Sequence, residues 1–371
     1  MGKLLKRFQK YYLEVNYMKI CFIGDGSSVH LKRWLNYFVS KNHEVHLITF
    51  TDSDVNGVAV HKIGNYDINS DGGNYKYIFS LNKIKKELKD IKPDIVNAHY
   101  VTSYGFIASI TKICPLVISA WGTDILVTPN KNFLYKFITK KALKNADLIT
   151  SDSEFMSNEI KKLVNKKNIL TVPMGIEKEL LNVERKENKD EINILSLRTV
   201  NKNSNIDVII KAFYLLIKEE KMNNIKLIIT NDGTEMENIK SLILKLGIED
   251  RVIVKGFVQR EELIELLAKA QLNISIPDSD STSVTLLESM ACGSFNIVSN
   301  IPANTEWIQD NYNGLVINEI NEKTLKSAMK NAILNEELRQ KALAINKDII
   351  SSKALWENNM KYVEEEYLKL I

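Results

Sequence analysis

The sequence lacks the features that identify several large classes of protein. Its three cysteines, Cys21, Cys114 and Cys292, show no Cys-x-x-Cys spacing, so we expect reduced, buried thiols rather than a disulfide framework or a zinc site. No apolar run reaches the length of a membrane span. No repeat of solenoid period and no low-complexity tract is present. These absences favour a globular protein of the cytoplasm, with the inner face of the membrane as the alternative location.

A strong excess of either charge is also missing. The 371 residues carry a formal net charge of +4, with 26% charged and 44% hydrophobic residues. This balance is typical of a globular protein and gives no support for nucleic-acid binding. A small positive charge is compatible with anionic small molecules or a lipid surface. The chain is long enough for two domains, each with its own core.

Two common kinds of ligand site have no sequence support. The five histidines lie in the N-terminal half, and no cluster of His, Cys and carboxylate residues has metal-ligand spacing, so we expect no metal. The turn at residues 24–28, Gly-Asp-Gly-Ser-Ser, follows the first predicted strand but lacks the third glycine of a dinucleotide fingerprint. A nicotinamide or flavin site is therefore poorly supported, and we expect no cofactor.

What the sequence does contain is a regular alternation of β-rich runs and helical stretches, which predicts α/β domains with doubly wound parallel sheets. We predict one domain over residues 18–176 and a second over residues 191–352. The segment 177–190 is rich in Glu, Lys and Asn, a composition typical of a solvated linker. The strands predicted in the first domain are residues 19–23, 44–50, 58–63, 95–98, 116–119, 147–150 and 169–172.

Residues 1–17 interleave lysine and arginine with leucine and aromatic residues, roughly as in a basic amphipathic helix. The segment has no long apolar core and no small-residue cleavage site, so it is not a secretory signal. Lys6 breaks the myristoylation pattern. Two interpretations remain, a weak anchor on anionic lipid and an N-terminal extension before a second plausible start at Met18. We favour the extension, because a single short helix binds membranes only marginally.

The most informative stretch is residues 277–293, in which a loop rich in Ser and Thr leads from a predicted strand into a predicted helix, Val284–Ala291. Such a loop offers backbone N–H groups, hydroxyls and the positive end of the helix dipole, which together suit a phosphate. Glu288 lies one turn into the helix and Asp280 lies eight residues earlier; carboxylates accept hydrogen bonds from sugar hydroxyls. The pattern predicts a nucleotide-sugar site, and its alternative is an ordinary N-cap cluster beside a surface glutamate.

These residues resemble the signature of the retaining glycosyltransferase family 4, within the GT-B superfamily. In that signature an acidic residue, seven intervening residues and a glutamate lead into a Glu-small-Met-Ala-x-Gly helix. Asp280 stands where a glutamate is usual, and residues 281–283 are Ser, Thr and Ser where glycines are common. The resemblance continues over residues 295–316. It implies two Rossmann-like domains facing each other across a cleft, with a final helix, 353–371, packed back on the first domain.

The resemblance also implies roles in the C-terminal domain. Arg198 and Lys202 would grip the donor diphosphate, Glu288 would hold the ribose hydroxyls and Asp280 would orient the donor sugar. The alternative for Arg198 and Lys202 is a pair of solvated loop charges. The other residues expected to bind the donor are Thr282, Ser283 and Val284 at the phosphates, and Phe257 and Val258 at the base, where ordinary strand-end packing is the alternative.

In the N-terminal domain the resemblance places the first Gly-rich turn towards the acceptor and the donor phosphates; its alternative is a simple strand-to-helix turn. Trp121 occupies the position where many relatives have a histidine. We therefore expect Trp121 to stack on a sugar ring, and His99 or Asp124 to make the polar contacts. The residues expected to line this side are Gly24, Gly26, His99, Tyr104, Trp121 and Asp124.

We therefore predict a retaining, metal-independent glycosyltransferase of the hexosyltransferase type. It would move a sugar from a nucleotide sugar to a glycan or lipid-linked acceptor in surface polysaccharide biosynthesis, with no nucleic-acid partner and at most weak peripheral membrane contact. One alternative is a nucleotide-sugar epimerase on the same fold. The other is a nucleotide-sugar-binding protein without turnover, because Asp280 and Trp121 replace commoner residues.

Overall fold

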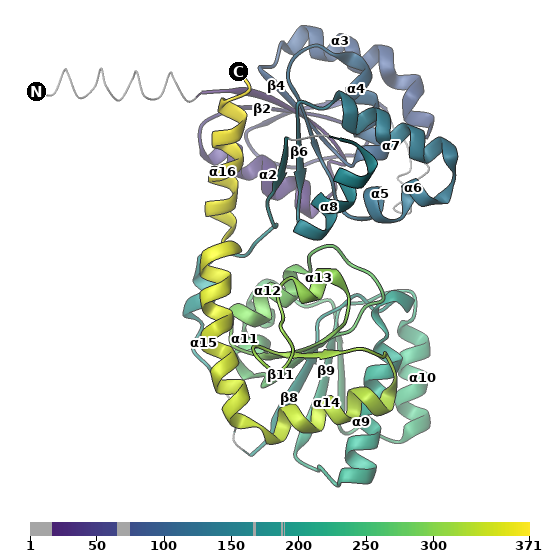
Figure 1. The fold of residues 1–371 in the computed structure, drawn as a ribbon, viewed down its shortest axis with the longest axis vertical. Helices are drawn as coiled ribbons and strands as arrows, with labels where there is room; N and C mark the ends of the chain where they lie inside the picture. The colour runs from purple at the N-terminus through teal and green to yellow at the C-terminus, as the bar shows by residue number, and fades with distance from the viewer. Residues whose placement is uncertain (1–16, 65–74, 166–167, 187, 189) are drawn as a thin grey trace, which may run out of the picture. The chain divides into compact units, whose positions relative to one another are not determined.

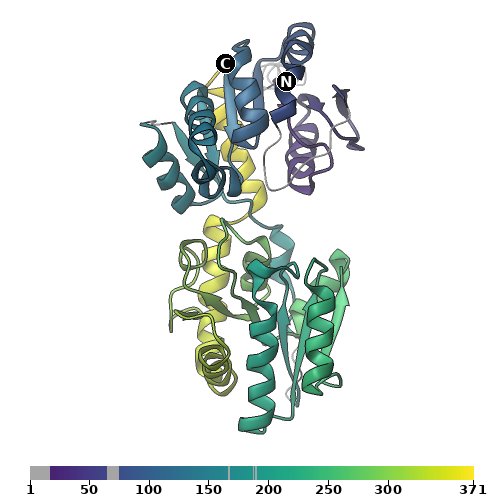
Figure 2. The same cartoon turned by 90° about the vertical axis from the view of Figure 1, so that its right-hand side faces the viewer.

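The computed structural model describes residues 17–64, 75–165, 168–186, 188 and 190–371. The basic segment predicted over residues 1–17 lies, apart from its last residue, outside the described residues. The chain divides into two compact units, the first of Met1–Val172 with Met360–Ile371 and the second of Pro173–Asn359. Each unit is a parallel sheet with helices on both faces (Figure 1, Figure 2).

The first unit is built on a seven-stranded sheet in the order β3-β2-β1-β4-β5-β6-β7, and each neighbouring pair is parallel. Its central strands are almost entirely buried because helices lie on both faces. The strand order reverses between β1 and β4, which is where open α/β sheets bind ligands at their carboxyl ends. The strands are β1 (Lys19–Ile23), β2 (Glu44–Thr49), β3 (Val58–Lys62), β4 (Ile95–His99), β5 (Leu116–Ser119), β6 (Leu148–Ser151) and β7 (Ile169–Thr171).

The helices of the first unit follow the carboxyl ends of these strands. The first of them, α2, begins because the Ser28 hydroxyl accepts a hydrogen bond from the N–H of Leu31, an N-cap. They are α2 (Val29–Ser40), α3 (Leu81–Ile91), α4 (Phe106–Thr111), α5 (Thr123–Leu126), α6 (Thr128–Lys131), α7 (Phe133–Asn145) and α8 (Glu154–Leu163), with a 3-10 turn, η1 (Tyr75–Ser80), and a π turn, η2 (Val101–Gly105).

The last helix, α16 (Trp356–Leu368), packs on α2. The rings of Phe38 and Tyr367 stack with their centroids 5.5 Å apart. Glu364 accepts a hydrogen bond from the Tyr37 hydroxyl at 2.7 Å and lies 3.0 Å from Nε2 of His43. The end of the chain is thus part of the first unit's core, and α16 (yellow) lies beside α2 in Figure 1.

The second unit contains a six-stranded parallel sheet in the order β10-β9-β8-β11-β12-β13. Its order reverses between β8 and β11, so a second ligand-binding position is expected at the carboxyl ends of these two strands. The strands are β8 (Ile192–Ser196), β9 (Ile225–Thr230), β10 (Val252–Gly256), β11 (Leu272–Ser275), β12 (Phe295–Ser299) and β13 (Leu315–Ile317).

The helices of the second unit alternate with its strands. The Ser283 hydroxyl caps the helix after β11 by accepting a hydrogen bond from the N–H of Leu286 at 3.3 Å. They are α9 (Ile206–Glu220), α10 (Met236–Leu246), α11 (Arg260–Lys269), α12 (Val284–Ala291), α13 (Pro302–Thr305), α14 (Glu322–Leu334) and α15 (Glu336–Lys353), with the 3-10 turns η3 (Lys178–Asn182) and η4 (Lys202–Ser204).

Residues 177–190 are the segment predicted as a solvated linker, and residues 177–186 of this segment pack on the second unit. Leu180 is 1% exposed and joins the apolar cluster beneath α12. The Arg185 guanidinium donates to the main-chain carbonyls of Leu267, Ala270 and Cys292, at the ends of α11 and α12. One leucine and one arginine thus attach a charged segment whose average composition is polar.

Candidate functional site

The carboxyl ends of β8 and β11 bring together residues that are far apart in the sequence. Arg198 follows β8, and Asp280 follows β11. Nη1 of Arg198 donates to Oδ2 of Asp280 and, at 3.2 Å, to the hydroxyl of Ser283. The side chains of Arg198 and Asp280 are only 16% and 20% exposed. A cation, a carboxylate and the N-cap of α12 therefore share one small polar site.

The start of α12 supplies hydrogen-bond donors to the same place. The first-turn N–H groups of Val284 and Thr285 have no acceptor within the helix, and the helix dipole makes this end positive. Thr282 is half-buried beside them. Together with the Arg198 guanidinium, these groups form the kind of surface that binds a phosphate.

The loop that carries Lys202 is attached to this site through the next residue, Asn203. Asn203 donates through its amide to the carbonyl of Ser279 at 3.0 Å and accepts from the N–H of Ser279 at 3.1 Å. The main-chain carbonyl of Asn203 also accepts a hydrogen bond from the N–H of Asp278 at 3.0 Å. Lys202 itself is exposed. The backbone beside Lys202 is thus fixed against the loop that carries Asp280, while the lysine side chain extends into solvent.

Glu288, one turn further along α12, is almost completely buried and is paired with a residue that the sequence analysis missed. Arg260, the first residue of α11, donates through Nη1 to Oε1 of Glu288 and through Nη2 to Oε2 of Glu177 at 2.6 Å. Burial lowers the pKa of Arg260, but the two carboxylates outweigh burial and raise it above its ordinary value. The pairing places a guanidinium against Glu288, of whose side chain only 6% is exposed.

Phe257 and Val258, expected at the base, follow β10 in a turn where Gly256 has a φ of +69°. Phe257 is 73% exposed, so its ring is not part of the unit's core. Val258 is half-buried and packs against the apolar cluster beneath α12. The ring of Phe257 is therefore exposed to solvent, whereas Val258 packs as an ordinary residue at the end of a strand.

The Gly-rich turn of the first unit is closely packed. A Cβ on Gly24 would lie 2.7 Å from a methyl of Leu31, and a Cβ on Gly26 would lie 2.9 Å from Cβ of Ser53. The N–H of Gly26 donates to the Thr49 hydroxyl at 3.0 Å. Gly26 is required for this close approach, because a Cβ there would also lie 3.1 Å from the main-chain oxygen of Asp52, whereas at Gly24 the short contact is to the flexible end of Leu31.

His99 and Trp121 lie in one aromatic cluster at the carboxyl ends of β4 and β5. Their ring centroids are 5.3 Å apart, and Trp121 also lies 5.2 Å from the ring of His30. Nε2 of His99 lies 2.8 Å from Oδ1 of Asn97, and its Nδ1 is buried with no hydrogen-bond partner among the described residues. Burial, helped by His30, lowers the pKa of His99 to about 3, so the imidazole is neutral at physiological pH. Trp121 is partly exposed, as a stacking residue must be.

Asp124 and Tyr104, both expected on the acceptor side, are buried. Asp124 is 0% exposed, and its two oxygens accept from the backbone N–H groups of Val101 at 2.7 Å and Trp121 at 3.0 Å. Burial raises the pKa of Asp124 to about 6 against the effect of these hydrogen bonds. Tyr104 is 4% exposed, with its ring 5.3 Å from that of Tyr77. Asp124 ties the loops after β4 and β5 together, and Tyr104 belongs to the core.

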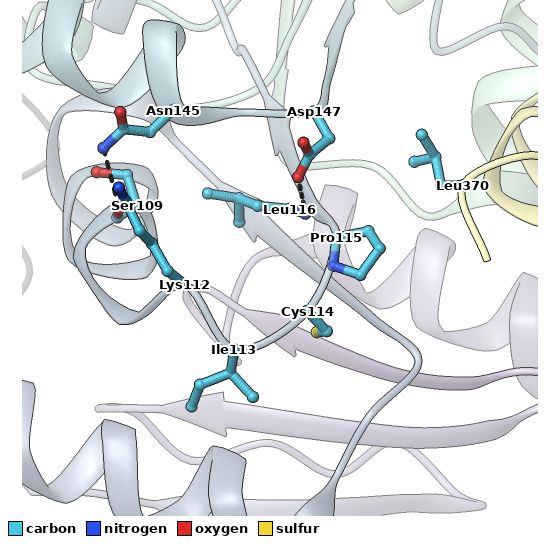
Figure 3. Close-up of a pocket in the computed structure, with 9 residues that line it drawn as sticks. All are labelled: Ser109, Lys112, Ile113, Cys114, Pro115, Leu116, Asn145, Asp147 and Leu370. Carbon is cyan, nitrogen blue, oxygen red and sulfur yellow. Dashed lines mark hydrogen bonds between the residues drawn. The ribbon is translucent and has the colours of Figure 1, made fainter.

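A separate hollow lies on the first unit at the amino ends of the sheet strands, away from the carboxyl ends described above (Figure 3). Its volume is about 540 Å³, and Leu116 and Asp147 place it at the amino ends of β5 and β6. Oδ2 of Asp147 accepts from the N–H of Leu116 at 2.8 Å, so this carboxylate is used within the fold. Burial raises the pKa of Cys114, which also lines the hollow, to about 11, so its thiol is unreactive at neutral pH. None of the predicted site residues lines this hollow.

Two family models match the chain. Residues 19–153 match the model described as glycosyl transferase 4-like, and residues 177–347 match that described as glycosyl transferases group 1. An uncharacterised glycosyltransferase of Methanocaldococcus jannaschii is 24% identical over 357 residues, 94% of this chain and 95% of that protein. An alpha-monoglucosyldiacylglycerol synthase of Streptococcus pneumoniae is 27% identical over 263 residues, 67% of this chain and 57% of that protein.

The fold itself is shared with solved structures. The Anabaena protein HepE, in complex with UDP and glucose, superposes with a TM-score of 0.75 at 15% identity, covering 94% of this chain and 99% of that protein. The fold and the polar site at β8 and β11 define a GT-B glycosyltransferase. With both family models matched in succession, the chain belongs to the glycosyl transferases group 1 family, glycosyltransferase family 4. None of the helices in the described parts of the chain combines the length and the apolar character needed to cross a membrane.

Proposed function

We propose that this glycosyltransferase transfers a sugar from a nucleoside-diphosphate sugar to a glycan or lipid-linked acceptor, with retention of anomeric configuration and without a metal ion. The observation that carries the proposal is the meeting of Arg198, Asp280 and Ser283 at the start of α12. We further propose that the reaction serves surface polysaccharide biosynthesis in the cytoplasm.

Charge on the leaving group determines what the site must supply. As the glycosidic bond to the donor breaks, the nucleoside diphosphate gains negative charge, and only donors fixed where that charge develops accelerate the step. Arg198 and the first-turn N–H groups of α12 are such donors, and Lys202 adds a mobile cation. In the proposed mechanism Arg198 exchanges its hydrogen bond to Asp280 for one to the diphosphate.

The two carboxylates then have different tasks. Asp280, freed from Arg198, accepts hydrogen bonds from hydroxyls of the donor sugar and so orients the anomeric carbon. Glu288 accepts hydrogen bonds from the ribose hydroxyls, and Arg260 holds it in place. An ionised carboxylate binds hydroxyl donors more strongly than a protonated one does.

The acceptor contacts belong to the first unit in this proposal. The partly exposed Trp121 ring suits stacking on a sugar, and the neutral His99 behind it fixes that ring. The pneumococcal relative, named for making a glucosylated diacylglycerol, supports a lipid or lipid-linked acceptor as one class to test.

A panel of UDP-, GDP- and ADP-sugars, each with and without detergent-solubilised lipid acceptors, tests the proposal. We expect slow hydrolysis of one donor, faster turnover with an acceptor and full activity in EDTA, and proton NMR of the product should show the donor's anomeric configuration. Glu288→Ala should lose turnover while circular dichroism stays unchanged. An isomerised donor without transfer, or binding without turnover, would contradict the proposal.

A further inference from the structure

Two asparagines lie on the second sheet where apolar side chains would be expected. Asn273 of β11 and Asn296 of β12 are buried, and they are direct neighbours in the parallel pairing of these two strands. Leu195 of β8, which pairs with Asn273 on its other side, belongs to the apolar cluster beneath α12. Parallel strands that are covered on both faces are usually continuous apolar runs. The two amides therefore interrupt the apolar surface on which α12 packs.

A hydroxyl of α12 joins the two amides into one network. Nδ2 of Asn273 donates to the hydroxyl of Ser289 at 3.1 Å and to Oδ1 of Asn296 at 2.9 Å. The hydroxyl of Ser289, which is buried, donates to the same Oδ1 of Asn296. Nδ2 of Asn296 donates to the main-chain carbonyl of Ser294 at 3.0 Å. Asn273, Asn296 and Ser289, called here the amide–serine network, thus attach α12 to two strands through hydrogen bonds, which need a defined direction, whereas apolar packing does not.

The amide–serine network lowers stability more than it adds to it. Oδ1 of Asn273 is buried and has no hydrogen-bond partner among the described residues. A buried acceptor left unpaired costs more free energy than one hydrogen bond usually returns. A buried polar group can instead fix one arrangement of packed elements, as a single buried asparagine fixes the register of a coiled coil. The element fixed here is α12, which carries Glu288 directly before Ser289.

We propose that the amide–serine network is a set of positioning residues that fixes the rotation of α12 about its axis and so directs Glu288 towards the nucleotide. Successive helical residues are about 100° apart around the axis, so that with Ser289 held against the sheet Glu288 is directed to α11, where Arg260 binds it. A rotation of about 20° would move the end of such a side chain by about 2 Å, which is enough to break a hydrogen bond. The inference rests on the proposed function, because that function places Glu288 at the ribose.

Apolar replacement of the whole network tests the inference. The triple variant of Asn273→Leu, Asn296→Leu and Ser289→Ala removes the three polar side chains together, so we expect thermal unfolding at the same or a higher temperature. Isothermal titration calorimetry with UDP, GDP and ADP should nevertheless show a Kd about tenfold higher for the nucleotide that the unsubstituted protein binds. Asn346→Leu is the matched control, because Asn346 forms a comparable buried pair with Asn313 at 2.8 Å. It should lower stability and leave this Kd unchanged.

A double-mutant cycle shows whether the network acts through Glu288. Glu288→Ala should raise the Kd much less in the triple variant than in the unsubstituted protein. Equal effects in the two backgrounds, or an unchanged Kd in the triple variant, would overturn the inference. If the triple variant does not fold, Ser289→Ala alone carries the same expectations, because it removes the hydroxyl that links α12 to both strands.

A structural measurement separates this inference from the proposed function. If the unsubstituted protein binds none of the three nucleotides, the proposed function is contradicted, and a crystal structure of the triple variant then decides the inference. We expect α12 to be rotated in that structure and the ion pair of Arg260 and Glu288 to be broken. An intact pair with an unrotated α12 would overturn the inference.

Discussion

Arg260 and Glu288 form an ion pair between the first turn of α11 and the middle of α12, and the other arm of the Arg260 guanidinium binds Glu177. Glu288 is therefore held by a residue 28 positions away that no local motif connects to it. A planar guanidinium suits this bridge because it presents two N–H pairs in a fixed fork, which an ammonium group does not. The pair links a strongly buried carboxylate to the turn that carries Phe257.

Arg260→Lys should weaken nucleotide binding without unfolding the protein. Lysine keeps the positive charge but cannot hold Glu288 and Glu177 at once, so we expect the Kd for the donor's nucleoside diphosphate to rise about tenfold, roughly 1.4 kcal/mol. Isothermal titration calorimetry measures this change. Glu177→Gln is the control, because it removes the outer contact alone and should change the Kd by less than the lysine variant does. Unchanged binding in Arg260→Lys would separate Glu288 from the ribose.

Arg198→Ala should lower kcat more than it raises KM. If Arg198 meets charge that develops on the diphosphate, its removal should cost about a hundredfold in kcat, the size of effect seen when one fixed donor to a developing anion is lost. Arg198→Lys should recover part of this loss, because a point charge replaces the planar fork. Initial-rate kinetics with the preferred donor give the answer, with Arg251→Ala, an arginine after α10, as the control. A change in KM alone would mean that Arg198 serves binding and not the chemical step.

His99 should make the protein less stable in mild acid. Its folded-state pKa of about 3 lies below the ordinary value of 6.5, so the unfolded chain binds a proton that the folded chain does not. The contribution to stability is complete above pH 6.5 and is lost as the pH falls towards 3, by about 1.4 kcal/mol per pH unit. Urea unfolding at pH 7 and pH 5 should show a smaller difference for His99→Gln than for the unsubstituted protein. Equal differences would show that His99 is already protonated in the folded state.

Asp124 should act in the opposite direction over part of the same range. Its pKa is raised from 3.8 to about 6, so the folded chain binds a proton before the unfolded one does. The resulting stabilisation is complete below pH 3.8 and is lost as the pH rises through 6. Relative to the unsubstituted protein, Asp124→Asn should therefore lose more stability at pH 4 than at pH 7. The hydrogen bond that the variant lacks is lost at both pH values. Chemical unfolding at the two pH values measures this, and a pH-independent loss would contradict the raised pKa.

The contacts of Glu364 on α16 with Tyr37 and His43 give a third pH-dependent test. Burial raises the pKa of Glu364, but hydrogen bonds from His43 and Tyr37 outweigh it, and the pKa is held below the ordinary value of 4.5. The stabilisation is present above pH 4.5 and should disappear as the pH falls through the lower, folded-state pKa. Tyr37→Phe should reduce it, and hydrogen exchange of the α16 amides should quicken in that variant at neutral pH. Unaltered exchange would show that ring stacking between Phe38 and Tyr367 holds the helix by itself.

The alternation of apolar runs and helical stretches was enough to predict the α/β architecture and several element bounds. The strands Lys19–Ile23 and Leu116–Ser119 and the helix Val284–Ala291 have the predicted ends, because buried parallel strands are continuous apolar runs and Ser283 is a clear N-cap. The strand β13 (Leu315–Ile317) was not predicted. The signature around Glu288 was enough to identify the family from the local amino-acid sequence.

The sequence by itself thus determined two doubly wound units and the loop-helix segment that carries Asp280, Ser283 and Glu288, because backbone periodicity and capping are local properties. Only the tertiary structure decided that Arg260 is the partner of Glu288, that Asp124 is buried and accepts hydrogen bonds from two backbone N–H groups, and that residues 177–186 pack on the second unit. The reason is physical: burial and ion pairing depend on which strand ends the sheet order brings together, and that order joins residues far apart in the chain.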